Sequence, residues 1–189
     1  MSAHSEGTAG GAVTIRVMRE DEFGAMRALS IAAFGDNEEI GTLLDGLRSS
    51  WAWDASLSFV ADLDGSIVGQ VLYTHAILDS PSRLVDVLVL SPIGVQPALQ
   101  RRGIGGMLVT ETLRTLAARA EPLVFLEGHP SYYPRFGFEK ASGLGFTAPS
   151  RRIPDEAFMV HRLPTHQPWM TGTLVYPDAF WRADAVGLR

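Results

Sequence analysis

The sequence predicts an α/β fold in which strands and helices share one principal domain. Three observations support this prediction. A length of 189 residues suits one domain of ordinary size. Segments that are rich in β-formers occur between segments whose apolar residues recur at helical spacing. The dipeptide Asp64-Gly65 between two β-rich runs is typical of a hairpin, so neighbouring strands pair through a tight turn.

Composition excludes several classes of function. Hydrophobic residues make up 46% and charged residues 20%, as in an ordinary globular protein. A net charge of −5 argues against a dedicated nucleic-acid binder. Because there is no cysteine, a thiolate metal site and a cysteine nucleophile are excluded, and a cytoplasmic location is expected. The scattered histidines lack ligand spacing, so we expect no metal, and no apolar run approaches the roughly 20 residues of a membrane-spanning helix.

The first half of the chain is expected to run strand, helix, helix and then a set of strands. Asp21 is the expected N-cap of the first helix. In chain order we expect a flexible lead-in over 1–12, a strand over 13–18, helices over 21–34 and 38–48, and strands over 57–63, 67–78 and 83–90.

A proline and a glycine interrupt the next stretch, where a central strand should continue. Pro92 lacks a ladder donor, and Gly94 is typical of a bulge or of a close backbone approach. Two interpretations are equally supported by the local sequence: a simple loop, or a strand end held open so that its backbone can meet a ligand.

The second half contains the strongest helical pattern. Apolar residues recur at helical spacing from 103 to 120. Around this helix we expect strands over 123–126, 138–141 and 157–163, and a short helix from Tyr132 to Phe136. Four aromatic residues in the tail, 164–189, indicate that it packs on the domain: Trp169, Tyr176, Phe180 and Trp181.

The segment that leads into this helix has the chemistry of an anion site. Glycines at 103, 105 and 106 remove side chains where the first helical amides lack internal partners. Those amides and the helix dipole attract a phosphate, and Arg101 and Arg102 add positive charge.

Two common nucleotide-binding motifs fit these glycines poorly. The Walker sequence Gly-x-x-x-x-Gly-Lys is absent. Gly103 and Gly105 fit the start of a dinucleotide fingerprint, but Leu108 occupies the third glycine position and no opening βαβ unit is expected. A crowded helix start beside ordinary surface arginines would account for the same residues without any ligand.

Several motifs taken together resemble the GNAT family of acyl-CoA-dependent N-acyltransferases. Gln100-Arg101-Arg102-Gly103-Ile104-Gly105 resembles the family's pyrophosphate loop, and Pro92–Val95 resembles its bulged fourth strand. The string Tyr132–Phe138 and the later Pro154–Val160 are similar to the bacterial group called YhbS-like N-acetyltransferases. The resemblance covers roughly residues 13–163.

The resemblance implies a specific architecture. The GNAT fold is a mixed, mostly antiparallel, twisted sheet flanked by helices, with its fourth and fifth strands splayed apart. Here those strands would be 83–95 and 123–127. The chain then divides into the lead-in 1–12, an acetyltransferase domain over 13–163 and a C-terminal extension over 164–189.

The resemblance also implies acetyl-CoA as co-substrate. Amides from 101 to 106 would bind its pyrophosphate, and the backbone of 93–95 would pair with the pantetheine arm as an added strand does. The expected cofactor-binding residues are Ile93, Gly94, Val95, Gln100, Arg101, Arg102, Gly103, Ile104, Gly105, Gly106, Tyr132 and Phe136.

The implied reaction moves an acetyl group to an amine. Without cysteine, a thiol acyl-enzyme is excluded, which leaves direct attack by the amine. The resemblance suggests the Val95 amide as oxyanion donor and Tyr133 as the acid that protonates the thiolate. A phenol with a pKa near 10 is protonated at neutral pH. The alternative is that Tyr133 only packs, and Tyr132 is a weaker candidate for the acid.

The base and the acceptor stay open at this point. An alkyl amine with a pKa of about 10.4 is almost wholly charged at pH 7, so a general base is useful. The candidates are Glu127, His129, Asp86, Glu38 and Glu39. Residues 34–60, including Trp51 and Trp53, either shape the acceptor pocket or pack in the core.

We expect the acceptor to be an amine of a small metabolite or of a protein. No nucleic-acid or membrane partner is expected. A homodimer is one expected assembly. Two rival functions are a non-catalytic acyl-CoA-binding or regulatory module on the same fold, and a nucleotide-binding enzyme.

Overall fold

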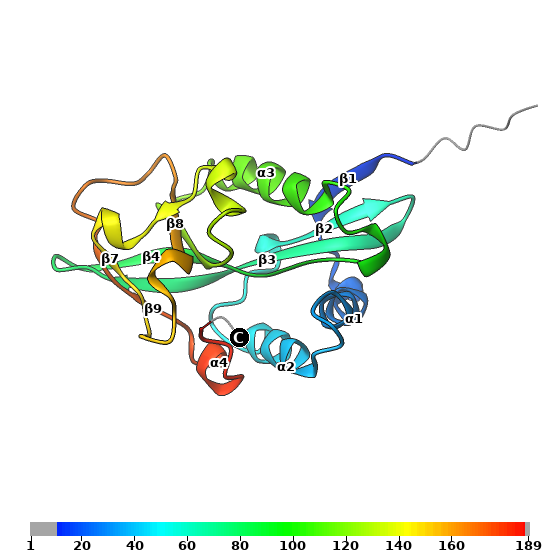
Figure 1. The fold of residues 1–189 in the computed structure, drawn as a ribbon, viewed down its shortest axis with the longest axis horizontal. Helices are drawn as coiled ribbons and strands as arrows, with labels where there is room; N and C mark the ends of the chain where they lie inside the picture. The colour runs from blue at the N-terminus through cyan, green and yellow to red at the C-terminus, as the bar shows by residue number, and fades with distance from the viewer. Residues whose placement is uncertain (1–10, 188–189) are drawn as a thin grey trace, which may run out of the picture.

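The computed structural model of the chain describes residues 11–187, so the expectations for 1–10 and 188–189 lie outside the described residues. Between these limits, nine strands form one mixed sheet in the order β1-β2-β3-β4-β5-β8-β6, and β9 pairs with both β3 and β7. Most neighbouring strands are antiparallel. Helix α3 covers one face of the sheet, and α1, α2 and α4 lie on the other (Figure 1). The expected fold class is confirmed.

The elements follow the expected order with shifted boundaries. The strands are β1 (Val13–Val17), β2 (Ser58–Leu63), β3 (Ser66–Asp79), β4 (Leu84–Val95), β5 (Leu123–Glu127), β6 (Glu139–Lys140), β7 (Phe146–Thr147), β8 (Phe158–Arg162) and β9 (Gly172–Val175). The α-helices are α1 (Phe23–Ala33), α2 (Glu38–Arg48), α3 (Ile104–Leu116) and α4 (Asp178–Arg182). The short helix expected from Tyr132 is the 3-10 helix η4 (Tyr133–Phe136).

The start of α1 differs from the expectation. Asp21 is not its N-cap, because residues 20–22 form a separate 3-10 turn and Glu22 occupies the cap position. The Glu22 carboxylate is bound by both terminal nitrogens of Arg16, at 2.7 and 2.8 Å, which fixes the turn. Helix α2 begins as expected, and the Asn37 side chain caps it by accepting a hydrogen bond from the Glu39 amide.

A β-bulge explains the proline and glycine in the fourth strand. Leu90 pairs with Tyr73 and Ile93 with Val71, so that Ser91 and Pro92 together face the single residue Leu72. The strand continues past this bulge to Val95. Of the two interpretations of this stretch, the structure therefore shows the strand that is held open and not the simple loop.

Beyond the bulge, β4 loses its second neighbour. Strands β4 and β5 are parallel and pair only through Leu88–Val124 and Val89–Phe125. Strand β4 runs on to Val95, while β5 ends at Glu127. The splay expected between the fourth and fifth strands is present, and it leaves the last residues of β4 paired with β3 alone.

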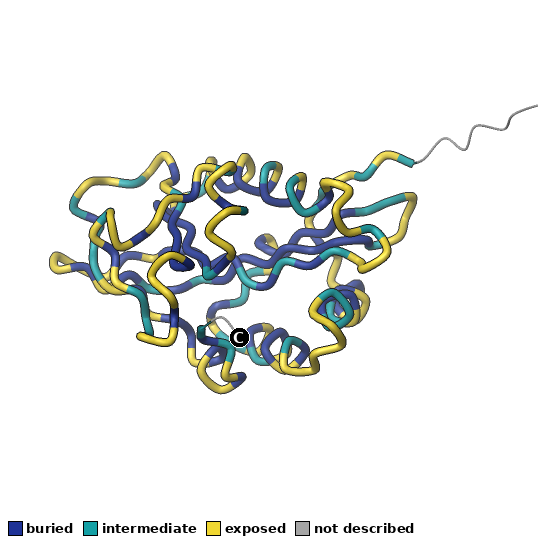
Figure 2. Tube along the Cα trace, in the orientation of Figure 1, coloured by how far each residue is buried: buried dark blue, intermediate teal, exposed yellow. Residues whose placement is uncertain are grey.

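Two apolar clusters hold the layers together, one on each sheet face, and the sheet between them is buried (Figure 2). Helix α3 packs on one face through its buried apolar stripe. Helices α1, α2 and α4 pack on the other. No helix within 11–187 is both long enough and apolar enough to cross a membrane.

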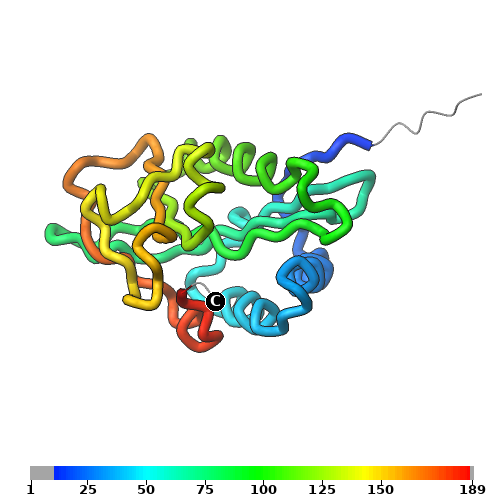
Figure 3. Tube along the Cα trace, viewed as in Figure 1, coloured from blue at the N-terminus to red at the C-terminus, as the bar shows by residue number. Residues whose placement is uncertain are grey.

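The C-terminal tail does more than pack on the domain, because it contributes a strand to the sheet and a helix to one of its faces. It supplies β9, which pairs with β3 through Val175–Ile77, and α4, whose Phe180 is only 2% exposed. The red C-terminal segment lies beside the cyan α2, far away in sequence (Figure 3). Neither β9 nor its short partner β7 was expected from the sequence. The division into a domain over 13–163 and an extension over 164–189 stays a prediction.

Candidate active site

The loop after β4 has the backbone shape that its glycines predict. Gly103 precedes α3 with φ of 86°, a left-handed conformation that favours glycine, and no side chain caps the helix. A Cβ on Gly105 would lie 3.1 Å from the Tyr132 hydroxyl, and one on Gly106 would lie 3.6 Å from the Phe136 ring. The small residues therefore let η4 pack closely over the start of α3, next to its unbonded amides.

A cavity of about 660 Å³, here called the loop pocket, lies at this helix start. Two arginines contribute to its wall, Arg101 from the loop and Arg135 from η4. The Arg135 guanidinium lies 4.0 Å from the centre of the Tyr132 ring. Open helix amides and two cations make the loop pocket suitable for a phosphate group. Its lining is Val95, Leu99, Gln100, Arg101, Gly103, Ile104, Gly105, Gly106, Tyr132, Arg135 and Phe136.

The register of β4 turns part of its backbone toward the gap. The Gln96 amide donates to the Val68 carbonyl, which makes that pair a hydrogen-bonded one. Because bonded and non-bonded pairs alternate in an antiparallel ladder, Ile93 and Val95 direct their backbone groups away from β3. The Val95 carbonyl accepts a hydrogen bond from the Gln100 side chain at 3.1 Å. The other outward groups lie at an edge that a ligand with amides could join.

That edge borders a second cavity of about 310 Å³, here called the strand pocket. It is lined by Ala33, Phe34, Ile93, Gly94, Val95, Gln100, Gly105 and Tyr132. Gly94 is needed for its shape, since a Cβ there would lie 2.9 Å from the Cβ of Ala33 in α1. The absence of a side chain at Gly94 thus lets α1 approach the strand.

A third cavity, of about 370 Å³, lies where β4 and β5 have parted, and we call it the inner cavity. Its walls come from the start of α2, the bulge of β4, the end of β5, η4 and the C-terminal segment. Phe34 and Ile93 also line the strand pocket, and Tyr132 and Gly105 line both the strand pocket and the loop pocket. The three cavities are therefore neighbours with shared walls, and we call the row that they form from the α3 N-terminus to the gap between the splayed strands the groove.

Tyr133 lies in the wall of the inner cavity, with 8% of its surface exposed. Its ring packs directly on Gly128 and makes an edge-on contact with Phe138. Burial raises the pKa of Tyr133 to about 12. Its hydroxyl forms no hydrogen bond with any residue between 11 and 187, so this protonated donor can serve a ligand.

Glu127, the last residue of β5, lies in the same wall. One carboxylate oxygen accepts a hydrogen bond from the Tyr176 hydroxyl and the other from the Gly187 amide, both at 2.9 Å. Burial raises the pKa of Glu127 above its usual value, although these two hydrogen bonds act in the opposite direction. A partly buried carboxylate with a raised pKa is typical of a general base.

The structure separates the five base candidates. Glu127 and Glu39 line the inner cavity, whereas Asp86, His129 and Glu38 line none of the three cavities. The residues expected to bind the cofactor line the groove with one exception, Arg102, which is exposed outside it.

The two tryptophans expected near the acceptor lie away from the inner cavity. Residues 34–43 do contribute to the inner cavity, but neither tryptophan does. Trp51 is 57% exposed in a separate surface hollow beside α4, and Trp53 packs edge-on against Phe23. Ile93 lines both the inner cavity and the strand pocket, whereas Val95 lines the strand pocket and not the inner cavity. The oxyanion donor stays a prediction.

Sequence reasoning missed several groove residues. Arg135 sits within the quoted motif, and its position directly before Phe136 and two residues after Tyr133 was an available signal. Tyr176 and Phe180 carry no local signal of a site, because they reach the inner cavity only through tertiary folding.

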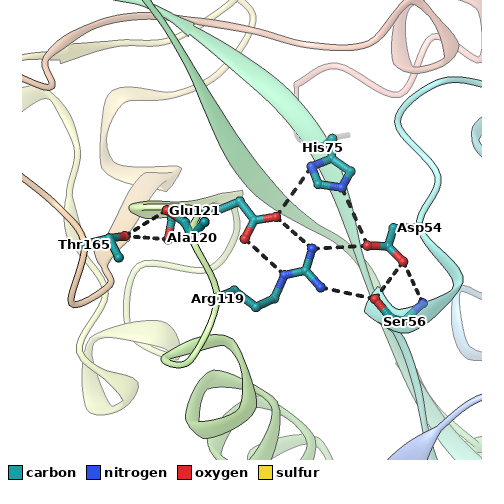
Figure 4. A network of polar contacts seen from close by, with 7 residues as sticks. All are labelled: Asp54, Ser56, His75, Arg119, Ala120, Glu121 and Thr165. Atoms are coloured by element: carbon teal, nitrogen blue, oxygen red, sulfur yellow. Dashed lines mark hydrogen bonds and ion pairs between the residues drawn. The ribbon is translucent and has the colours of Figure 1, made fainter.

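A second cluster of titratable side chains lies outside the groove (Figure 4). Arg119 bridges Asp54 at 3.1 Å and Glu121 at 2.8 Å, and the His75 ring lies 3.8 Å from both carboxylates. Burial acts to raise the pKa of Glu121, but the hydrogen bonds and charge of Arg119, together with a backbone hydrogen bond, lower that pKa overall. Because Arg119 joins two carboxylates from different segments, the cluster ties the end of α3 to the loop before β2. Among the described residues, no group of three or more acidic or histidine side chains is placed to hold a metal ion.

Comparison with known proteins agrees with this geometry. The family model described as acetyltransferase (GNAT) domain matches residues 14–141. The uncharacterized N-acetyltransferase YjhQ of Escherichia coli K12 is 32% identical over 173 residues, which cover 87% of this chain and 92% of that protein.

Two solved structures are similar over nearly their whole length. Escherichia coli YhbS, crystallised in complex with CoA, superposes with a TM-score of 0.81 at 26% identity, covering 95% of this chain and 97% of its own. A GNAT family acetyltransferase from Brucella melitensis, crystallised with acetyl-CoA, gives a TM-score of 0.71 at 28% identity, covering 90% of this chain and 99% of its own.

Proposed function

The chain belongs to the GNAT family of acetyltransferases, and on that premise we propose that it transfers an acetyl group from acetyl-CoA to an amine by direct attack. The observation that carries the proposal is the continuity of the groove. It joins an anion site at a helix N-terminus to a cavity that contains a protonated phenol and a buried carboxylate.

Acetyl-CoA matches the groove from end to end. Its pyrophosphate suits the open amides of α3 and the cations Arg101 and Arg135. Its pantetheine amides suit the outward backbone groups of Ile93 and Val95. The acetyl thioester then reaches the inner cavity past Ile93, which lines both compartments.

The inner cavity supplies a base for the incoming ammonium and an acid for the departing thiolate. Glu127 takes a proton from the incoming ammonium, so that the neutral nitrogen attacks the thioester carbonyl. The Ile93 amide stabilises the oxyanion as the C–N bond forms. The C–S bond then breaks, and Tyr133 gives its proton to the departing thiolate. The attacking nitrogen loses its second proton to solvent as the amide forms. Solvent then carries the proton held by Glu127 back to Tyr133, and the products are the acetylated amine, CoA as its thiol and one released proton.

Titration calorimetry tests the first half of this proposal. Acetyl-CoA should bind with one site per chain, and CoA should compete with it. Release of free CoA on adding amines tests the second half and separates an enzyme from a binding module. Absence of binding at millimolar acetyl-CoA would overturn the assignment of the groove, and binding without CoA release for any amine would favour the non-catalytic alternative.

A further inference from the structure

We infer that the acceptor is a small amine with an apolar body and no carboxylate, and this inference rests on the proposed function. The inner cavity carries the argument, because whatever attacks the thioester must enter it. Its volume of about 370 Å³ is near the lower limit for small-molecule sites. The thioester end of the co-substrate takes part of that space, so the acceptor must be small.

The charges around the cavity select for a cation. Glu39 and Glu127 line it, while no lysine, arginine or histidine between 11 and 187 does so. Asp184 also lines it and pairs with Arg152 at 2.6 Å, a residue that is not itself part of the lining. Glu127 accepts hydrogen bonds from a hydroxyl and a backbone amide, both neutral, and among the described residues the only cation that acts on its charge is the more distant Arg152.

The same charges reject an anion. A free amino acid would bring its carboxylate into a partly buried space that is already lined by three carboxylates and by no cation from the described part of the chain. A charge buried without a partner is costly, and like charges add to the cost. The decarboxylated counterpart of that amino acid avoids both penalties.

Most of the remaining lining is apolar or aromatic, and Asn37 and Ser91 are its neutral polar side chains. Phe34, Ile40, Leu43, Leu90 and Phe180 surround the carboxylates. The Tyr176 hydroxyl is already committed to Glu127. This wall suits an alkyl or aryl body, whereas a polyanionic acceptor would leave its charges without partners.

Matched pairs of amines test the inference with acetyl-CoA and the whole chain. The pairs are tyramine with tyrosine, phenethylamine with phenylalanine, and cadaverine with lysine, and a lysine-containing peptide represents a protein acceptor. We expect kcat/KM to be at least about tenfold higher for the decarboxylated member of each pair, and the peptide to be acetylated more slowly than the best small amine.

Two charge-reversal variants sharpen this test. Glu39→Lys puts a cation into the wall and should reduce the discrimination within each pair by at least about threefold. Glu38→Lys is its control, because Glu38 lies in the same first turn of α2 but does not line the cavity. Affinity for CoA should be retained in both variants, which shows that they are folded.

The outcomes separate the inference from the proposed function. Equal or faster acetylation of the amino acids, preference for the peptide, unchanged discrimination in Glu39→Lys, or acetyl-CoA binding with no small amine acetylated would each overturn the inference and leave the cofactor assignment standing. Failure to bind acetyl-CoA would overturn the proposed function itself.

Discussion

The two ends of the groove are built in different ways. The loop pocket comes from two short stretches of chain, 95–106 and 132–136, and the groups proposed to bind phosphate there are mainly backbone amides. The inner cavity draws side chains from five separate elements between Phe34 and Gly187. Because of this difference, cofactor binding and catalysis can be perturbed separately. An added side chain in the loop pocket should weaken CoA binding. Loss of a single functional group in the inner cavity should lower kcat.

Tyr133→Phe is expected to give the largest difference between the effect on catalysis and the effect on CoA binding. This change removes the hydroxyl and keeps the ring that packs on Gly128 and Phe138, so kcat should fall by roughly 10²–10⁴-fold while affinity for CoA stays within about twofold. Tyr132→Phe is the control, since Tyr132 lines only the strand and loop pockets. Steady-state kinetics and calorimetry on both variants give the answer, and a kcat near that of the wild type for Tyr133→Phe would leave the residue a packing role only.

The pH profile adds to this prediction. The acid must be protonated to act, and the pKa of Tyr133 is raised to about 12. Loss of activity from its ionisation should therefore fall near pH 12 and not near the ordinary phenol pKa of about 10. A kcat–pH profile that falls with a midpoint near 10 in the wild type and not in Tyr133→Phe would contradict the burial of this hydroxyl.

Glu127→Gln should lower kcat by about a hundredfold, because it removes the proposed base and keeps the shape of the side chain. A base must be deprotonated, so the wild-type rate should fall as pH drops through the raised pKa of Glu127, above the usual range for a glutamate. The rate of the Glu127→Gln variant should no longer fall in this acidic pH range. An unchanged limb in Glu127→Gln would assign the base to another group, with Glu39 as the next candidate in the cavity.

Gly103→Glu should weaken CoA binding by at least about tenfold, or ~1.4 kcal/mol, because a carboxylate would stand at the anion site. Gly103→Gln is the matched control. Both side chains meet the same strain at φ of 86° and the same open space around the Cβ, and they differ only in charge. Equal affinities in the two variants would show that the α3 N-terminus does not hold the pyrophosphate.

The smallest expected effects compare an aromatic residue at the junction with one outside the groove. Phe34→Ala removes a wall shared by the strand pocket and the inner cavity, so KM for the acceptor should rise several-fold. Trp51→Ala should change neither kcat nor KM by more than about twofold, since Trp51 lies 57% exposed in a separate hollow. A larger effect from Trp51 would restore the expectation that it shapes the acceptor pocket.

The same difference between the two ends explains what could be predicted from the sequence. The loop motif is local: glycine conformation, helix start and arginines all lie within a few residues, so its geometry follows from 100–106 alone. The bulge is local too, although Pro92 and Gly94 were equally compatible with a loop. Only the register opposite Leu72 decides between the two.

The lining of the inner cavity could not be predicted from local sequence. Tyr176 reaches Glu127 across 49 positions of sequence, and Phe180 reaches it through α4, which packs against α2. Such contacts depend on strand β9 joining the sheet, and a four-residue strand has too little pattern to identify. The choice among the five base candidates needed the same tertiary information.

Amide hydrogen exchange with and without CoA tests most directly the claim that one groove has a cofactor end and a chemical end. CoA should protect amides in 93–106 and 132–137, which form the β4 edge, the loop and η4, and should leave 178–185 nearly unchanged. Adding an acceptor that is acetylated should then extend protection to that C-terminal segment. Protection by CoA alone that is confined to other segments, or that is stronger in 178–185 than in 93–106, would contradict the account.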